Sequence, residues 1–252
     1  MTTRDAWYAR AFDATYLEVY AHRDAEEAER ATRALLEPLG LAHLRVLDLA
    51  CGAGRYMTAL GRCGARVVGV DLSVPLLRAA LHATRRRPGV LGLVRGDMLR
   101  LPFRVASYDI VLSMFTSFGY FVSENEDRAV LAGIARVLRP GGRLVLDLFN
   151  AERVRRDLVP ETHRKAGRFD VHERRHVDAA RHTVVKEIEL RDGDERHRYR
   201  EEVRLWTSAA LEEALEQAGF DVEQRWGGYD GEAHDPQQSE RLIVCARRRP
   251  QR

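Results

Sequence analysis

Residues 46–54 read Val-Leu-Asp-Leu-Ala-Cys-Gly-Ala-Gly. The apolar run predicts a buried strand, the small residues after it predict a tight turn, and a helical pattern begins near Tyr56. Two glycines at this junction, Gly52 and Gly54, allow the backbone to approach a bound ligand where a Cβ atom would collide. A strand, a glycine turn and a helix in this order predict a nucleotide-type cofactor site at the carboxyl end of a parallel sheet.

A second apolar run ends in an acidic residue. Residues 67–70 read Val-Val-Gly-Val, and Asp71 follows them. We expect Asp71 to be exposed at the tip of the second strand, where its carboxylate can accept hydrogen bonds from both hydroxyls of a ribose. Folds that bind NAD and folds that bind S-adenosylmethionine share this feature.

Two details favour S-adenosylmethionine over NAD. The dinucleotide fingerprint has a third glycine where helix and strand pack closely, and this chain has Met57 at that position. Asp48 precedes the turn on the first strand. Its carboxylate suits a ligand that carries an ammonium and a sulfonium, and it would repel a pyrophosphate.

Five stretches together resemble the class I S-adenosylmethionine-dependent methyltransferases, and the match is strong over residues 40–150. They are residues 46–54, residues 68–73 (Val-Gly-Val-Asp-Leu-Ser), residues 96–98 (Gly-Asp-Met), residues 108–114 (Tyr-Asp-Ile-Val-Leu-Ser-Met) and residues 137–144 (Val-Leu-Arg-Pro-Gly-Gly-Arg-Leu). The resemblance implies an α/β fold of the Rossmann-like type, with a seven-stranded, mostly parallel sheet and helices on both faces. It implies S-adenosyl-L-methionine as cofactor and says little about the methyl acceptor.

The resemblance also implies roles for individual residues. The methionine end of the cofactor is assigned to Asp48, the Ala50 backbone, Gly52, Gly54 and either Ser113 or Met114. The adenosine end is assigned to Asp71 at the ribose and to Leu72, Asp97 and Met98 at the adenine. An amino-terminal segment often covers the cofactor in this family, and Tyr8 and Tyr16 are the expected contacts from it.

Composition limits the other classes of function. At 252 residues the chain can build one α/β domain with one elaboration, and 41 basic against 38 acidic residues give a net charge of only +3. This balance does not imply a nucleic-acid or membrane partner, and no apolar segment approaches the ~18–20 residues of a membrane span. Three scattered cysteines fit a reducing compartment. We expect a soluble, cytoplasmic protein.

The chain divides into four predicted parts: a helical lid over residues 1–40, a cofactor-binding core over 41–150, an antiparallel β insertion over 151–206 and a terminal helix with the last two strands over 207–252. Within the insertion, alternation of β-forming and charged residues predicts three strands, at residues 169–177, 183–190 and 197–206. Such an insertion either covers the methyl-donor site or forms the surface of a homodimer. The sequence leaves both alternatives open.

One motif in the insertion matches a zinc-protease pattern. Residues 172–176 read His-Glu-Arg-Arg-His, and the metal chemistry requires the two histidines on one face of a helix. The flanking residues alternate as a strand does. On a strand His172 and His176 still share a face, but Glu173 points away from it and cannot act on a metal-bound water. We therefore expect no metal at this motif.

Residues 115–121, Phe-Thr-Ser-Phe-Gly-Tyr-Phe, follow the fourth strand at the edge where substrates enter such sheets. They lack the Asn/Asp-Pro-Pro-aromatic tetrapeptide of the methyltransferases that act on nucleic-acid amines, which disfavours a nucleic-acid substrate. The loop resembles small-molecule methyltransferases, among them the amino-sugar N-methyltransferases. The candidate acceptor-binding residues are Phe118, Tyr120, Asn150 and Tyr229, and the candidate bases are Tyr120, His172 and His176.

The resulting hypothesis is an S-adenosylmethionine-dependent methyltransferase acting at N or O of a small-molecule acceptor. Methyl transfer from a sulfonium is a direct displacement, so the enzyme can act largely by alignment. The alternatives are the same chemistry on tRNA or protein, an NAD-dependent oxidoreductase, and a cofactor-binding module without catalysis.

Overall fold

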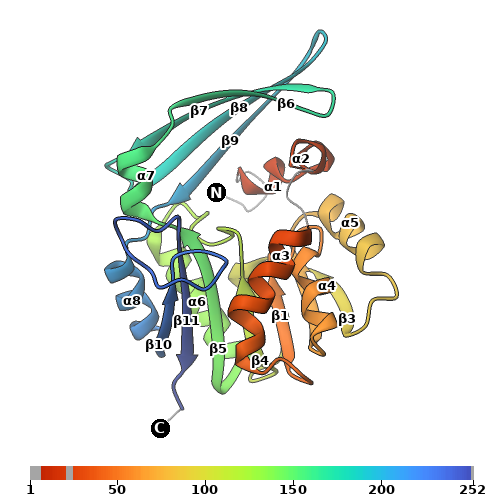
Figure 1. The fold of residues 1–252 in the computed structure, drawn as a ribbon, viewed down its shortest axis with the longest axis vertical. Coiled ribbons are helices and arrows are strands. Elements are labelled where there is room, and N and C mark those ends of the chain that lie inside the picture. The colour runs from red at the N-terminus through yellow and green to blue at the C-terminus, as the bar shows by residue number, and fades with distance from the viewer. Residues whose placement is uncertain (1–6, 21–24, 251–252) are drawn as a thin grey trace.

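The computed structural model describes residues 7–20 and 25–250, so parts of the predicted lid (1–6 and 21–24) and the last two residues of the predicted carboxyl-terminal part lie outside it. The main sheet has seven strands in the order β10-β11-β5-β4-β1-β2-β3 (Figure 1). Within this sheet only β11 runs against the others, because it pairs antiparallel with both β5 and β10. The predicted fold class is therefore confirmed.

The strands of the main sheet are β1 (Arg45–Leu49), β2 (Arg66–Asp71), β3 (Val90–Arg95), β4 (Tyr108–Ser113), β5 (Leu138–Phe149), β10 (Phe220–Trp226) and β11 (Arg241–Arg248). The helices beside it are α3 (Ala25–Ala31), α4 (Arg55–Arg62), α5 (Val74–Thr84), α6 (Glu124–Val137) and α8 (Ser208–Gln217). Among the described residues no helix is both long and apolar enough to cross a membrane.

Alternate residues of the central strands enter two different apolar layers. In β5, Leu144, Leu146 and Leu148 pack with residues of α6 and α8, whereas Val145 packs with residues of α3 and α4. A strand covered by helices on both faces has to be apolar throughout, which explains why every residue of β4 is buried. The central strands of the sheet are therefore buried between two layers of helices.

A second sheet, here called the roof sheet, is inserted between β5 and α8. It contains β6 (Glu161–Ala166), β7 (Phe169–Asp178), β8 (Thr183–Asp192) and β9 (Glu195–Arg204), all antiparallel, and α7 (Ala151–Asp157) precedes it. The prediction of three strands was wrong by one, because β6 was missed. Half of residues 161–166 are charged and only Thr162 is β-branched, a composition that suits an exposed edge strand but carries no strand signal.

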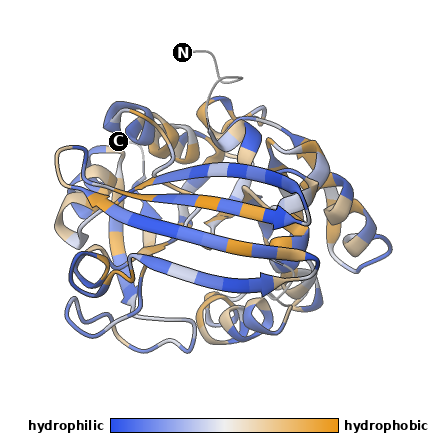
Figure 2. Cartoon of the chain, turned by 90° about the horizontal axis from the view of Figure 1, so that it is seen from above, coloured by the Kyte–Doolittle hydropathy of each residue, from blue (hydrophilic) through white to orange (hydrophobic). Residues whose placement is uncertain are grey.

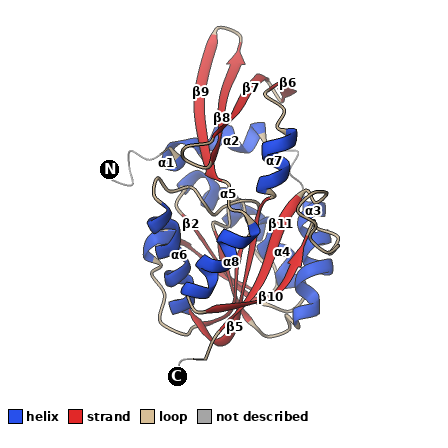
Figure 3. Ribbon diagram, turned by 90° about the vertical axis from the view of Figure 1, so that its left-hand side faces the viewer, coloured by secondary structure: helices blue, strands red, loops and turns tan. Residues whose placement is uncertain are grey.

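The roof sheet lies across the carboxyl edge of the main sheet (Figure 1). Seen from above, its four strands run side by side, and hydrophilic residues predominate along them with hydrophobic residues interspersed (Figure 2). Two short helices, α1 (Tyr8–Ala11) and α2 (Ala14–Val19), lie beneath it, and the hairpin of β8 and β9 extends away from the main sheet (Figure 3). Val19 and Tyr20 pack against Phe169, Val171 and Ile188 on the underside of the roof.

A buried ion pair fastens the roof sheet to the core. The Arg204 Nε at the end of β9 lies 2.8 Å from the Asp127 Oδ2 in α6, and Asp127 is fully buried. The same guanidinium donates to the carbonyl oxygens of Phe121 and Val122, so it also holds the end of the loop after β4. Burial raises the pKa of Asp127 to about 6, and Arg204 opposes that rise.

We expect Arg204→Met to lower the free energy of unfolding by about 3–5 kcal/mol, because it leaves a buried carboxylate without its cation. Without Arg204 the pKa of Asp127 rises further, and the folded variant keeps a proton that the unfolded chain releases. The difference in free energy of unfolding between the native protein and the variant should therefore grow from about pH 5 to about pH 8. Denaturant unfolding at both pH values measures it.

The matched control is Arg200→Met, an exposed arginine of the same strand whose ion pairs are at the surface. It should change the free energy of unfolding by less than about 1 kcal/mol. Equal losses in the two variants would contradict the role given to the Arg204–Asp127 pair.

Candidate functional site

A cavity of about 610 Å³ lies between the carboxyl edge of the main sheet and the roof sheet. This volume is typical of small-molecule and cofactor sites. Its floor is formed by the turns after β1, β2 and β4, one wall by α1 and α2, and its roof by β7, β8 and β9. Parts of the chain that are far apart in sequence therefore meet at one site.

The turn after β1 has the backbone conformation that a close ligand contact needs. Ala50 and Gly52 both have positive φ, at 57° and 54°, and both line the cavity. The Cys51 N–H donates to the Val70 carbonyl oxygen at 3.1 Å, which ties the turn to β2. A Cβ atom at Gly52 would meet no protein atom within 4 Å, so the space beside this glycine belongs to the cavity.

Asp71 lies at the cavity but is not exposed. It is 9% accessible, and its two carboxylate oxygens accept the N–H groups of Gly52 at 2.9 Å and Ser73 at 2.8 Å. Burial raises its pKa while these backbone hydrogen bonds lower it. The expectation of an exposed carboxylate was wrong, because Asp71 connects the turns after β1 and β2 as well as facing the cavity.

Asp48 is a buried carboxylate with an unsatisfied oxygen. It is 3% accessible, lines the cavity, and its Oδ2 has no hydrogen-bond partner among the described residues. Burial raises its pKa to about 7, the Asp71 charge adds to the rise and Arg55 opposes it. An unpaired buried carboxylate is costly unless a ligand donor reaches it. The ammonium of S-adenosylmethionine is such a donor, so the residues present fit this cofactor.

The predicted adenine side is assembled at the ends of β2 and β3. Leu72, Asp97 and Met98 all line the cavity. The Asp97 Oδ1 accepts the Leu99 N–H at 2.9 Å and caps the short helix η4 (Met98–Arg100). The capping bond fixes this carboxylate at the cavity wall and leaves its other oxygen for a ligand donor.

Two residues assigned to the cofactor do not line the cavity. Gly54 faces α5, where a Cβ atom would come within 3.0 Å of Thr84 Cγ2 and 3.3 Å of Ala80 Cβ. This glycine, with φ at 80°, is therefore required for helix packing. Ser113 is buried behind Met114, and of the two residues only Met114 lines the cavity.

The loop after β4 holds two non-glycine residues in a strained conformation. Phe115 and Thr116 have φ values of 60° and 56° and line the cavity. Asp147 on β5 supports both, since its Oδ2 accepts the Phe115 N–H at 2.6 Å and its carbonyl accepts the Thr116 N–H at 2.9 Å. The Arg241 guanidinium donates to the Asp147 Oδ1 and to the Thr116 Oγ1. Asp147, Arg241 and the loop after β4 therefore form one hydrogen-bonded network. Strain of this kind persists only where surrounding contacts impose it.

Tyr229 belongs to this network and not to the cavity wall. Its hydroxyl donates to the Asp147 Oδ2 at 2.7 Å, and burial, followed by the Asp147 charge, raises its pKa. Asn150 is also away from the cavity. Its side chain donates to the Pro236 and Ser239 carbonyl oxygens and accepts the Glu152 N–H at the start of α7. The structure gives both residues protein partners in place of the predicted acceptor contact.

Phe118 does not line the cavity either. It is 1% accessible and packs in the core, with its ring centroid 5.9 Å from that of Trp206. Tyr120 does line the cavity, where its ring lies 4.9 Å from Trp7 and 5.8 Å from Phe12. The loop therefore places the Phe118 ring in the core and the Tyr120 ring at the cavity.

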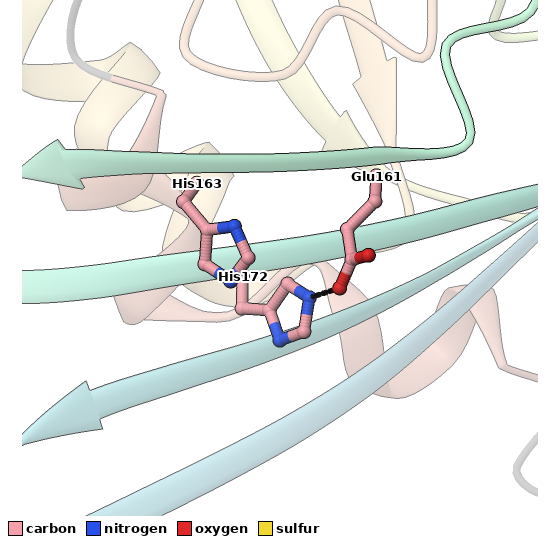
Figure 4. Close-up of side chains that lie close together, drawn as sticks. All are labelled: Glu161, His163 and His172. Atoms are coloured by element: carbon pink, nitrogen blue, oxygen red, sulfur yellow. Dashed lines mark hydrogen bonds and ion pairs between the residues drawn. The ribbon is translucent and has the colours of Figure 1, made fainter.

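The two histidines proposed as bases lie on the far side of the roof sheet. His172 and His176 share a strand face that points away from the cavity, and neither lines it. His172 stacks on His163 at 3.9 Å between ring centroids and bonds to Glu161 (Figure 4). Residues 172–176 form part of β7, so the strand interpretation of the His-Glu-Arg-Arg-His motif is confirmed.

Aromatic rings form the wall contributed by α1 and α2. Besides the predicted Tyr8 and Tyr16, Trp7 and Phe12 line the cavity. The Ser73 hydroxyl donates to the Phe12 carbonyl oxygen at 2.5 Å, which ties this wall to the turn after β2. The resemblance implied contacts from Tyr8 and Tyr16 but gave no indication of Trp7 and Phe12.

Sequence reasoning missed the polar residues of the roof. Arg175, Lys186 and Glu201 line the cavity from β7, β8 and β9. In each strand the side chains next to these residues in sequence point to the opposite face. This alternation was the only feature of the sequence that could have indicated which side chains face the cavity. Without the strand register, these residues could not be placed beside one another or above the cofactor site.

The sequence matches a family model described as a methyltransferase domain over residues 46–142. It is also 30% identical over 205 residues to the cypemycin N-terminal methyltransferase of a Streptomyces species, covering 80% of this chain and 82% of that protein. The chain belongs to the S-adenosylmethionine-dependent methyltransferases. The methyltransferase is 39% identical over 123 residues to the demethylmenaquinone methyltransferase of Corynebacterium kroppenstedtii, a match that covers 48% of each protein.

Solved structures share the fold of this methyltransferase. An S-adenosylmethionine-dependent methyltransferase from Clostridium acetobutylicum superposes with a TM-score of 0.79 at 17% identity, covering 94% of this chain and 97% of the other. The sugar N-methyltransferase KedS8 from Streptoalloteichus superposes with a TM-score of 0.71 at 22% identity, covering 93% of both chains. The roof sheet is included in such matches, since they extend well beyond the residues of the methyltransferase domain.

The raised pKa of Asp48 predicts a pH-dependent cofactor affinity. If the ionised carboxylate receives the ligand ammonium, the affinity for S-adenosylhomocysteine should increase up to about tenfold from about pH 6 to about pH 8, as Asp48 ionises. Asp48→Asn should bind more weakly and show a nearly flat profile over the same range. Calorimetric titration measures both, and titration of the ligand itself cancels between the two proteins. An equally steep profile in the variant would contradict the assignment.

The burial of Phe118 predicts a structural effect of its removal. Phe118→Ala should lower the free energy of unfolding by about 3–5 kcal/mol and leave the affinity of the folded protein for S-adenosylhomocysteine unchanged. Val122→Ala, which removes an exposed side chain close to the same loop, is the control and should have little effect. A stable Phe118→Ala protein with impaired turnover would return Phe118 to the acceptor site.

Proposed function

We propose that the methyltransferase transfers the methyl group of S-adenosylmethionine to a nitrogen or oxygen of a small-molecule acceptor. The observation that carries this proposal is the enclosure of the site. Helices α1 and α2 and the roof sheet cover the floor that would bind the methyl donor, so the acceptor reaches the donor inside a cavity and not on an open surface.

The predicted parts of the chain take functional roles in this proposal. The described residues 7–20 of the predicted lid and residues 151–206 supply the wall and the roof of an acceptor chamber, and residues 41–150 supply the floor. The chamber is mixed in character. Apolar residues of α7 and the roof, Val154, Leu158, Val184 and Val203, line it together with the aromatic wall. A partly apolar acceptor fits these surfaces.

Alignment accounts for most of the proposed catalysis. S-adenosylmethionine supplies a methyl group on a sulfonium, which is already an activated leaving group. Asp48 orients the ammonium, Asp71 and Asp97 hold the adenosine, and the cover excludes water from the acceptor. Orientation of two reactants in this way can lower the activation free energy by about 7–11 kcal/mol. Tyr120 remains the candidate base, because it lines the cavity whereas His172 and His176 do not.

Tyr8 is a poor base in the same wall. Burial, followed by the Asp97 and Glu126 charges, raises its pKa to about 12. Its hydroxyl therefore stays protonated at neutral pH and serves as a hydrogen-bond donor. An acceptor amine would have to arrive neutral or lose its proton to another group.

A second candidate acceptor is the amino group of a peptide. The cypemycin N-terminal methyltransferase, by its name, acts at a peptide terminus, and its match extends over most of this chain. A peptide would have to insert its terminus into the covered cavity. Cytoplasmic action is also part of the proposal, supported by three cysteines that are all free in the described structure.

Metabolite profiling tests the proposed function. The protein is incubated with labelled S-adenosylmethionine and the small-molecule extract of the cells that make it, and products that gain a methyl group are identified by mass spectrometry. Asp71→Ala is the matched control. It should lose about tenfold to a hundredfold in cofactor affinity and form correspondingly less product, with circular dichroism verifying its fold.

Labelled product from the native protein and not from the variant supports a small-molecule acceptor. The opposite outcome is that the protein binds S-adenosylhomocysteine, labels no small molecule and labels an added peptide at its terminus. This outcome would contradict a small-molecule acceptor and support a peptide acceptor.

A further inference from the structure

The roof of the cavity carries a row of charged side chains in strand register. Arg175 on β7 pairs with Lys186 on β8, and Lys186 pairs with Glu201 on β9. All three side chains line the cavity. The neighbouring row on one side consists of Val177, Val184 and Val203, so the charged row is a polar stripe beside apolar surface.

Two of the three charges in this row have the same sign and are adjacent. Like charges directly opposite one another on neighbouring strands are destabilising. The side chains are also largely removed from solvent, with Arg175, Lys186 and Glu201 at 21%, 18% and 17% accessibility. Glu173 pairs with Arg175 and Glu201 pairs with Lys186. These two carboxylates allow the cations to lie side by side, and an anionic group of a ligand could form further charge-assisted hydrogen bonds with both.

The hydrogen bonds of the row hold both cations in place. Lys186 Nζ lies 2.6 Å from a Glu201 oxygen and 2.8 Å from the Tyr20 hydroxyl, and an ammonium has three N–H groups. The Arg175 guanidinium, with five N–H groups, donates to Thr162 at 3.0 Å and bonds to Glu173. Both heads are thus preorganised, and each has more N–H groups than these partners use.

The floor and the roof present different charged groups to the cavity. The floor presents the carboxylates of Asp48, Asp71 and Asp97, which match a cationic methyl donor. The roof presents Arg175, Lys186 and Glu201 to the cavity, and the buried Glu173 pairs with Arg175 beside them. An acceptor that spans the two surfaces would place its methylated atom near the floor and its other end at the cations.

From this arrangement we infer that the acceptor carries an anionic oxygen group, a carboxylate or a phosphate, on the end remote from the methylated atom, and that Arg175 and Lys186 bind this group. The inference rests on the proposed function and specifies the substrate class of the same site. Arg175 and Lys186 act in specificity and take no part in binding the methyl donor.

The test separates acceptors by charge. The small-molecule extract is divided on an anion exchanger at mildly alkaline pH into a retained and an unretained fraction, and each is incubated with labelled S-adenosylmethionine and the native protein. The labelled product should form from the retained fraction. Phosphatase treatment of that fraction distinguishes the two sources of the anion, because it removes a phosphate acceptor and leaves a carboxylate acceptor unchanged.

Substitutions in the row should change acceptor kinetics and leave the donor site intact. Arg175→Gln and Lys186→Met should each raise the KM for the retained acceptor about tenfold to a hundredfold, with affinity for S-adenosylhomocysteine unchanged. Glu201→Gln removes the competing carboxylate and should lower that KM, an effect in the opposite direction that a merely structural role would not produce. Arg174→Gln is the control, since Arg174 is exposed on the other face of β7.

Labelled product from the unretained fraction alone would overturn the inference and leave the proposed function standing. An unchanged KM in folded Arg175→Gln and Lys186→Met would also overturn it. No labelled product from either fraction, with S-adenosylhomocysteine bound normally, would overturn the proposed function and this inference with it.

Discussion

The buried carboxylate of Asp147 determines the shape of the site more than any residue at the cavity surface. It is fully buried at the end of β5, bonds to Arg241 from the neighbouring strand β11, and accepts hydrogen bonds from the Phe115 backbone and the Tyr229 hydroxyl. A buried charge must be paired and hydrogen-bonded to persist. Meeting this requirement fixes the strained loop after β4, which lies between the donor floor and the acceptor chamber.

Two buried carboxylates at the floor of the cavity, Asp71 and Asp48, differ in their hydrogen-bond partners. Both carboxylate oxygens of Asp71 accept hydrogen bonds from the backbone of the turns that it joins. The Asp48 Oδ2 has no hydrogen-bond partner among the described residues. The first carboxylate shapes the site as well as facing the cavity, and the second has an oxygen that a ligand donor could reach. Burial raises the pKa of both. The affinity for a cationic cofactor therefore depends on a preformed scaffold.

The fold and the donor side could be predicted from sequence because they depend on local signals. An apolar run, a glycine turn and a terminal acid place Gly52 and Asp71 at one sheet edge without any knowledge of distant contacts. The failures have a common physical cause. Gly54 packs against a helix about 30 residues away in sequence, Phe118 packs against Trp206, and Tyr229 bonds to Asp147, so each role depends on a tertiary partner that local pattern cannot identify.

The polar residues of the roof differ from those of the floor, because their position depends on strand register. Arg175, Lys186 and Glu201 lie in three strands and become neighbours only when β7, β8 and β9 pair in one register. A shift of one residue would turn these side chains to the outer face and bring their sequence neighbours toward the cavity. The floor residues lie in short contiguous motifs, so sequence alone could place them. The roof residues are brought together only by the pairing of three strands, so sequence alone could not.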